Sequence, residues 1–342
     1  MNVSRFFARS RLSKLSLLSL TGDFQISSWK YLASQTTLLT TLSITDRRSL
    51  PFPTASQLYL ILSSNPNLRR LTLSYAAIPQ DTDGSTSRVP LPNLKRLNLS
   101  GEFCHLFGLL RRLILPEVLD EMCLLGFRST VHDVSQTLAP YMRDYFRRDD
   151  RFRNNLEISS SFSTSLISLS VDVVGTQSTA PAKESPRVVF GVTPTPLPPP
   201  DVLEQLAVNF VAPLPREHVV SFEDRVGRKL PEELFFMMPN IKTLHIHGAE
   251  LPEGFLQPNP DGPHANTKLL PSLRFLCLKG VTLNDDDWGR LTKYLVHQTS
   301  DGQTISLEVG GYSPHPCPEV ANEIENLIEN FAYDFLYPEN SN

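Results

Sequence analysis

The chain has 342 residues, of which 40% are hydrophobic and 9% aromatic, so it can form a large buried core and is not disordered throughout. Its formal charge of −4 argues against a nucleic-acid binder, which usually carries a basic excess. Four cysteines, at positions 104, 123, 277 and 317, are too few and too scattered for a disulfide framework or a zinc cluster. Leucine is in excess, with 52 residues, and this predicts an internal repeat.

Four segments share a proline, an Asn or Ser, and then Leu or Ile at three fixed positions. They are PNLRRLTL from Pro66, PNLKRLNL from Pro92, PNIKTLHI from Pro239 and PSLRFLCL from Pro271. Looser copies of L-x-x-L-x-L start at Leu12, Leu39, Leu119, Leu166, Leu203 and Ile305. A repeat of 25 to 32 residues predicts an α/β solenoid of about ten irregular units. Each copy is then a short strand of a parallel concave sheet, with leucines in the core and the residues between them facing outward.

Helices are expected between these strands, on the convex side. Thr54 is a candidate N-cap for TASQLYLILSSN, and Asn284 for DDDWGRLTKYLVHQ. Further helices are predicted at 102–113 and at about 223–238. The segment 317–336 has helical periodicity and is expected to close the C-terminal end as a capping helix.

Two stretches depart from the repeat. Residues 175–200 contain seven prolines and are predicted to be an inserted loop, within which 187–192 could form an extra strand. Residues 258–268 are predicted to be a second surface loop. Because the repeat resumes on both sides of each stretch, the sequence favours one domain over 1–342.

The leucine-proline-x-leucine cadence, the segment LAPYMRDYFRRD and the segment NDDDWGRL resemble the leucine-rich-repeat half of fungal F-box proteins. This resemblance implies a ribonuclease-inhibitor-like horseshoe whose repeats hold a substrate protein. In that family an N-terminal F-box binds the linker subunit of a cullin ubiquitin ligase. The strand expected at Leu12 leaves no room for an F-box before it. The chain is therefore expected to be a truncated F-box protein or a repeat-only relative, and to meet the linker subunit only if an F-box exists upstream.

The N-terminus permits two interpretations. Residues 1–22 carry four basic residues, no acidic residue and many serines, as mitochondrial transit peptides do. The repeat register of Leu12 instead places this segment in the folded domain. No apolar run approaches the roughly 18 residues of a membrane span, so a soluble protein of the cytoplasm or nucleus is expected, with mitochondrial import as the alternative.

The outward residues of the predicted strands form rows across the sheet. The middle row is expected to read Ser16, Ser43, Thr72, Asn98, Cys123, Ser170, Ala207, His245 and Cys277, with Glu308 as a candidate for its last position. Its most specific feature is His245 and His247 beside Cys277, which could bind a transition metal or form a Cys–His nucleophile pair. A solvated strand with mixed polar residues is the favoured interpretation, because the pattern assures neither a fourth ligand nor an orienting carboxylate.

Arg70 and Arg96 are expected to lie side by side on consecutive strands, where two guanidinium groups could bind a carboxylate or phosphate of a partner. They could equally serve to keep the surface soluble. The residues predicted to bind a partner protein are Arg70, Arg96, Glu121, Asp172, His245, His247, Phe275 and Lys279.

Catalytic motifs are missing: there is no glycine-rich phosphate loop, no His-Glu-x-x-His and no Gly-x-Ser-x-Gly. We therefore expect a protein-interaction module of the F-box substrate-receptor type, with no catalytic residue, metal or cofactor and no membrane or nucleic-acid partner. The alternatives are a repeat scaffold unrelated to ubiquitination and, from a different class, an enzyme that uses Cys277 and His245.

Overall fold

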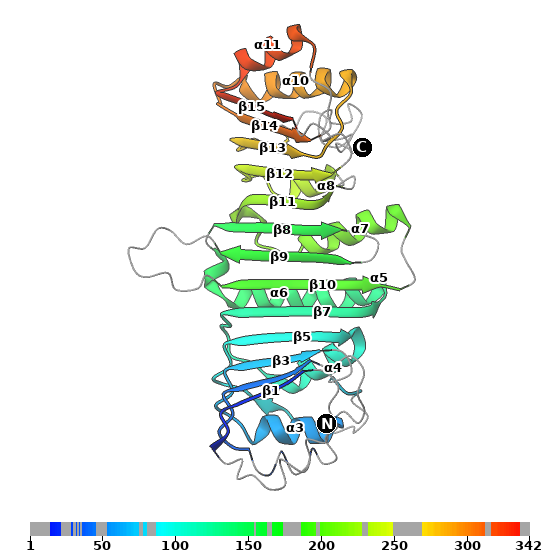
Figure 1. Cartoon of the computed structure of the whole chain (residues 1–342), viewed down its shortest axis with the longest axis vertical. Coiled ribbons are helices and arrows are strands. Elements are labelled where there is room, and N and C mark those ends of the chain that lie inside the picture. The colour runs from blue at the N-terminus through cyan, green and yellow to red at the C-terminus, as the bar shows by residue number, and fades with distance from the viewer. Residues whose placement is uncertain are drawn as a thin grey trace, which may run out of the picture. The chain divides into compact units, whose positions relative to one another are not determined.

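A computed structural model gives the fold (Figure 1). It describes residues 14–21, 29, 32, 34, 36–45, 53–74, 78–80, 87–153, 155–162, 166–173, 186–195, 199–227, 232–248, 269–311 and 316–335. The chain divides into two compact units, where the sequence favoured one domain. The first unit is Met1–Asp133 with Thr179–Leu197, and the second is Val134–Ser178 with Pro198–Asn342.

The first unit contains a parallel sheet with the strand order β1-β2-β3-β5-β7-β10. These strands are β1 (Leu17–Thr21), β2 (Thr41–Thr45), β3 (Arg70–Ser74), β5 (Arg96–Glu102), β7 (Glu121–Ser129) and β10 (Arg187–Pro194). A separate short pair joins β4 (Val89–Pro90) and β6 (Leu113–Ile114). The helices whose bounds fall within the described residues of this unit are α3 (Ala55–Ser63), α4 (Phe103–Arg112) and α5 (Val131–Asp133).

The repeat pattern explains these strands. In β3 the leucines Leu71 and Leu73 are fully buried while the residues between them are partly or fully exposed, as period-two alternation requires. The predicted cap of α3 is confirmed, because the Thr54 hydroxyl accepts a hydrogen bond from the Gln57 backbone and the Gln57 side chain accepts one from the Thr54 backbone. Helix α4 is also confirmed.

The structure corrects the first copy of the repeat. Leu17 pairs with Thr41 and Leu18 with Leu42, so the register lies three residues later than the copy predicted at Leu12. Leu18, expected to face outward, is therefore buried. The segment contains the pattern twice, at Leu12 and at Leu15, and the second copy forms the strand.

The extra strand predicted at 187–192 within the proline-rich segment is confirmed, and it extends to Pro194. Arg187–Pro194 forms β10, which pairs in parallel with β7 and places Val189 opposite Cys123. Ser170, predicted to follow Cys123 in the middle row, lies on another strand. The rest of the predicted loop is mostly outside the described residues, as is the loop predicted at 258–268.

The second unit contains a sheet with the order β9-β8-β11-β12-β13-β14-β15 (Figure 1). Its strands are β8 (Leu156–Phe162), β9 (Ile167–Val173), β11 (Val219–Gly227), β12 (Thr243–Gly248), β13 (Phe275–Lys279), β14 (Ser306–Gly311) and β15 (Asn330–Phe335). All neighbouring pairs are parallel except β8 and β9, which are antiparallel. The copy predicted at Leu166 thus forms a strand, but one that runs against its neighbour.

Helices and helical turns complete this unit. The α-helices are α6 (Ala139–Arg148), α7 (Pro200–Val211), α8 (Glu232–Met237), α10 (Asp285–Thr299) and α11 (Pro318–Leu327), with a π-helical turn at Val134–Leu138 and 3-10 turns at Asp150–Arg153 and Arg216–His218. The cap predicted at Asn284 is confirmed by a reciprocal pair of hydrogen bonds with Asp287. The segment LAPYMRDYFRRD contains α6.

Three predicted elements of the second unit are wrong in whole or in part. The strand predicted at Leu203 is the helix α7, whose buried residues Leu206, Phe210 and Val211 follow helical spacing. The helix predicted at 223–238 is instead the strand β11 followed by the short helix α8. The capping helix predicted at 317–336 ends at Leu327, and β15 follows it because the chain at Ile328 is extended.

The fold class is therefore α/β, with mostly parallel strands and helices in both units. Among the described residues, no helix combines the length and the apolar character that a membrane span would need.

Candidate functional site: a polar strand face in the second unit

The strands of the second unit present one continuous polar row. Backbone register places Ser159 opposite Ser170 and Glu223, Glu223 opposite His245, His245 opposite Cys277, and Cys277 opposite Glu308. The predicted neighbours His245 and Cys277 are confirmed. Ala207, predicted to precede His245, belongs to α7, and Glu223 takes its place.

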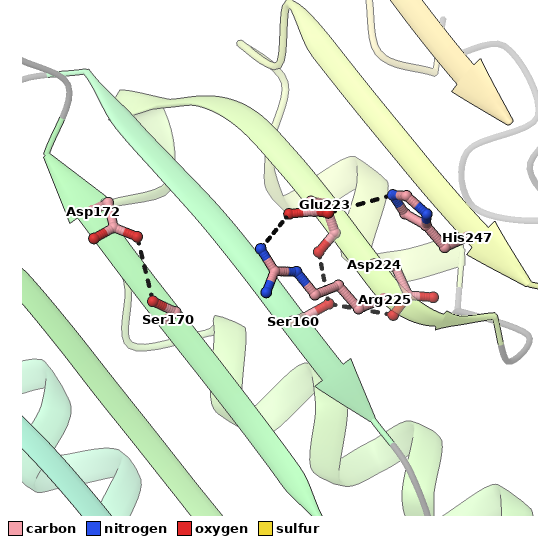
Figure 2. A network of polar contacts seen from close by, with 7 residues as sticks. All are labelled: Ser160, Ser170, Asp172, Glu223, Asp224, Arg225 and His247. Carbon is pink, nitrogen blue, oxygen red and sulfur yellow. Dashed lines mark hydrogen bonds and ion pairs between the residues drawn. The ribbon is translucent and has the colours of Figure 1, made fainter. Parts of the chain in front are cut away.

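Glu223, a member of this row, contacts both Arg225 and His247 (Figure 2). Its Oε2 lies 3.0 Å from Nη2 of Arg225, and its Oε1 lies 3.3 Å from Nε2 of His247. Burial alone would raise the pKa of the Glu223 carboxyl, but the hydrogen bond and charge of Arg225, the charge of His247 and a hydrogen bond from Ser159 lower it overall. Glu223 is therefore ionised at neutral pH and holds two side chains in position.

On the opposite face of the sheet, a serine of β8 and an aspartate of β11 form a buried polar pair. Ser160 and Asp224 are each 1% exposed, and the Ser160 hydroxyl lies 3.5 Å from Oδ1 of Asp224 (Figure 2). The Ser160 hydroxyl also donates to the backbone oxygen of Glu223 at 3.3 Å. These contacts join β8 to β11 directly beneath Glu223.

His245 is held neutral at physiological pH. Burial lowers the pKa of its imidazole, and the charge of Glu223, which acts in the opposite direction, does not reverse this. The ring lies beside Phe275, with centroids 5.5 Å apart. His245 can therefore both donate and accept a hydrogen bond while presenting no charge.

Cys277 is a poor nucleophile in this setting. Burial and the charge of Glu308 raise the pKa of its thiol to about 11, so the reactive thiolate is scarce at neutral pH. His247 is turned to Glu223 rather than to Cys277. Among the described residues, the ligand atoms of His245, His247 and Cys277 do not form a group within 4.8 Å of one another, so the geometry does not favour the metal hypothesis.

A cavity of about 510 Å³ opens on this face. Side chains and backbone from β9, β8, β11 and β12 line it: Asn155, Glu157, Ile158, Ser159, Asp172, Val220, Ser221, Glu223, Arg225, Lys242, Thr243 and His245. Glu157 and Asp172 lie directly opposite each other on the antiparallel pair, and Ser170 lies 3.3 Å from Asp172 (Figure 2). The cavity is therefore polar, with carboxylates concentrated at the β8–β9 end.

Lys279 also belongs to this face. Its Nζ lies 3.3 Å from Oε1 of Glu308, on the neighbouring strand. Five of the eight predicted partner-binding residues therefore lie on strands of the second unit: Asp172, His245, His247, Phe275 and Lys279.

The other three predicted residues lie in the first unit. Arg70 is opposite Arg96, as expected, and Arg96 is opposite Glu121. Nε of Arg96 lies 3.8 Å from Oε2 of Glu121, so one of the two guanidinium groups already faces a carboxylate. This reduces the case for a dedicated anion site at Arg70 and Arg96.

Sequence reasoning missed Glu157, Glu223, Arg225 and Lys242 as site residues. The first three lie on β8 and β11, neither of which contains a copy of L-x-x-L-x-L. The available signal was the apolar–polar alternation of Val220, Ser221, Phe222 and Glu223, but the charged run Glu-Asp-Arg after Phe222 was interpreted as the start of a helix.

Comparisons of the chain with protein-family models, with curated proteins and with solved structures found no match. The function is therefore argued from the residues of this chain.

Proposed function

We propose that the chain is a protein-interaction module that binds a partner on the polar strand face of its second unit. The observation that carries this proposal is the cavity of about 510 Å³, whose lining comes from four strands and includes both carboxylates and cations. A rigid sheet presents such groups at fixed spacing, and repeat proteins use such faces for binding. A peptide fits a mixed polar surface of this kind better than a small apolar ligand does.

The charges suggest what the partner brings to the cavity. Glu157 and Asp172 are directly opposite each other, and like charges in that position destabilise a sheet. A lysine or arginine side chain of a partner, placed between these two carboxylates, would relieve that repulsion. We therefore expect a partner segment with a basic residue at the β8–β9 end.

The proposal also includes a specific type of α/β fold and a specific cellular role. The Pro-Asn-Leu copies and the parallel strands they form favour a leucine-rich-repeat solenoid with this face on its concave side. The resemblance to the repeat half of F-box proteins favours a substrate-receptor role in a ubiquitin ligase, in the cytoplasm or nucleus. The alternative is a scaffold unrelated to ubiquitination. The raised pKa of Cys277 weighs against the third candidate, a Cys–His enzyme.

A site-specific photo-crosslinker tests the binding face. Placed at Thr243, which lines the cavity, it should capture one defined partner in cells; placed at exposed Asn322 on α11, it should not. Glu223→Ala should then weaken binding of that partner by about tenfold or more, as at an interface hot spot, while Glu325→Ala on α11 should leave it unchanged. Equal capture from both positions would reject this face as the binding site.

Purification of the crosslinked complex from the same cells distinguishes a substrate receptor from a scaffold. In a substrate receptor the crosslinked partner should carry ubiquitin, and the protein should co-purify with the ligase linker subunit if an F-box exists upstream of this chain. A scaffold should bind the partner with neither result.

A further inference from the structure

Three side chains capable of binding a metal gather at the start of α4 in the first unit. Glu102, Cys104 and His105 each offer one ligand atom, and these atoms all lie within 4.8 Å of one another. Glu102 is the N-cap residue of α4 and His105 is the third residue of the helix, so the two side chains lie on the same side of the first turn. The Glu102 carboxylate accepts no capping hydrogen bond from the backbone of the helix, which leaves it for other contacts.

Arg128 orients the Glu102 carboxylate. Nη1 of Arg128 donates to Oε1 of Glu102 at 2.7 Å, while Oε2 faces Nε2 of His105 at 3.8 Å. One oxygen of the Glu102 carboxylate is thus held by Arg128, while the other points at the His105 imidazole. Carboxylates that bind metals in proteins are commonly oriented in this way, by a hydrogen bond from a residue that does not itself bind the metal.

The position of Arg128 is itself unusual. Its φ of 55° lies in the left-handed region, where a residue with a side chain is disfavoured by roughly 1–2 kcal/mol. The pairing of β7 with β10 skips this residue, since Phe127 pairs with Thr193 and Ser129 with Pro194. The resulting bulge directs the arginine toward Glu102 from the neighbouring strand.

A cavity of about 440 Å³ adjoins these ligands. It is lined by Ile78, Pro79, Gln80, Glu102, His105, Phe127 and Arg128. A zinc site with three protein ligands keeps a fourth position for water or another small ligand. The cavity provides space for such a fourth ligand beside Glu102 and His105.

We propose that Glu102, Cys104 and His105 bind one Zn²⁺ ion. A thiolate, an imidazole and a carboxylate are the ligand types that zinc prefers. In a tetrahedral site with bonds of about 2.0–2.1 Å, nitrogen and oxygen ligands lie roughly 3.3 Å apart. The observed 3.8 Å between Glu102 and His105 must therefore shorten by only about half an ångström. Cys104 is exposed and can adjust.

The charges around the site act in both directions. The positive end of the helix and Arg128 both oppose a cation. The carboxylate of Glu102 and the thiolate with which Cys104 would bind zinc supply two negative charges against them.

Calorimetric titration of the full chain with Zn²⁺ tests the proposal. We expect one ion per chain, and an affinity lower by at least about tenfold in Cys104→Ser and in His105→Ala, because even outer-shell partners of a metal are worth that much. Cys317→Ser, which removes another exposed thiol, is the matched control and should bind as the wild type does. Affinity and stoichiometry that are unchanged in both ligand variants would overturn the site.

Two further measurements use only the wild-type protein, so their results do not depend on whether the variants fold. Co²⁺ bound to the wild type should show a thiolate-to-metal charge-transfer band. Zn²⁺ should slow alkylation of Cys104, but not of Cys317, when each peptide is followed by mass spectrometry. Equal alkylation of Cys104 with and without Zn²⁺, or Co²⁺ binding without the charge-transfer band, would reject thiolate ligation.

Discussion

Asn65 shows how a single polar side chain can connect two segments of the first unit. It is 1% exposed, and its Oδ1 accepts a hydrogen bond from the backbone of Leu39 at 2.9 Å. Its Nδ2 donates to the backbone oxygens of Thr36 at 3.1 Å and Ile61 at 2.7 Å. The Asn65 side chain thus pairs with buried backbone groups of two segments: α3, and the chain that precedes β2.

Asn65→Ala should therefore destabilise the protein strongly. Three backbone groups would lose their partner where water is excluded, and we expect a loss of roughly 2–4 kcal/mol in the free energy of unfolding, measured in urea. Asn93→Ala is the control, since Asn93 makes a similar hydrogen bond to Pro66 at 3.2 Å but is exposed. A control that costs as much as Asn65→Ala would contradict the explanation.

The shifted pKa of His245 makes stability depend on pH. Because burial lowers the folded-state pKa below 6.5, the unfolded chain binds a proton more readily, and the folded state loses stability as the pH falls through about 6.5. The facing charges act in both directions: Glu223 and Glu308 raise the pKa, whereas His247 and Lys279 lower it. Between about pH 7.5 and about pH 5.5, the wild type should lose more stability than His245→Gln. Parallel stability curves for the two proteins would contradict the lowered pKa.

At the scale of elements, the approach of α4 to β7 depends on one glycine. A Cβ atom at Gly126 would lie 2.7 Å from Cδ2 of Phe103, the buried first residue of α4. Gly126→Ala should therefore cost about 1–3 kcal/mol through overpacking. Gly289→Ala in α10 meets no atom within 4 Å and should instead stabilise the protein by about 0.5–1 kcal/mol. Thermal and urea unfolding of both variants test the opposite signs.

The same six-residue pattern can specify either a strand or a helix, and this limits how well elements are predicted from sequence. All four copies that begin with proline form strands where expected, at β3, β5, β12 and β13. The copy at Leu203 forms α7, because L-x-x-L also has the spacing of a helix and the apolar series continues to Phe210 and Val211. A proline two residues before the first leucine or isoleucine resolves the ambiguity, because in all four copies it lies in a turn that precedes the strand, closed for example by the hydrogen bond from the Leu68 backbone N–H to the Asn65 oxygen.

At the scale of the molecule, the candidate site was only partly predictable because sheet order does not follow chain order. The chain returns to the first unit after β9 to place β10 beside β7. In the second unit β8 lies between β9 and β11. Local repeats correctly predicted His245 beside Cys277 and Arg70 beside Arg96, whose strands follow each other in both chain and sheet. Glu157 and Asp172 lie on an antiparallel pair of consecutive strands, which the leucine repeat does not encode, and Glu223 joins them through the pairing of β11 with β8.

Nearest-neighbour strand packing predicts that core mutations act locally in each unit. Leu97 on β5 and Leu276 on β13 are matched, since each is 0% exposed on a strand flanked by two parallel neighbours. Replacing either with alanine should cost about 2–5 kcal/mol through loss of contacts and the cavity left behind.

Hydrogen exchange followed by mass spectrometry should show where that energy is lost. In repeat-like sheets each strand depends mainly on its neighbours, so Leu97→Ala should accelerate exchange in β3, β5 and β7. Leu276→Ala should do so in β12, β13 and β14. An equal increase in every strand of both units, from either variant, would mean that all these strands unfold as one cooperative structure. If the response is local, destabilising the first unit with Leu97→Ala leaves the face around Glu223 intact, and partner binding should survive. Leu276→Ala destabilises the strands that form this face, so partner binding should be lost.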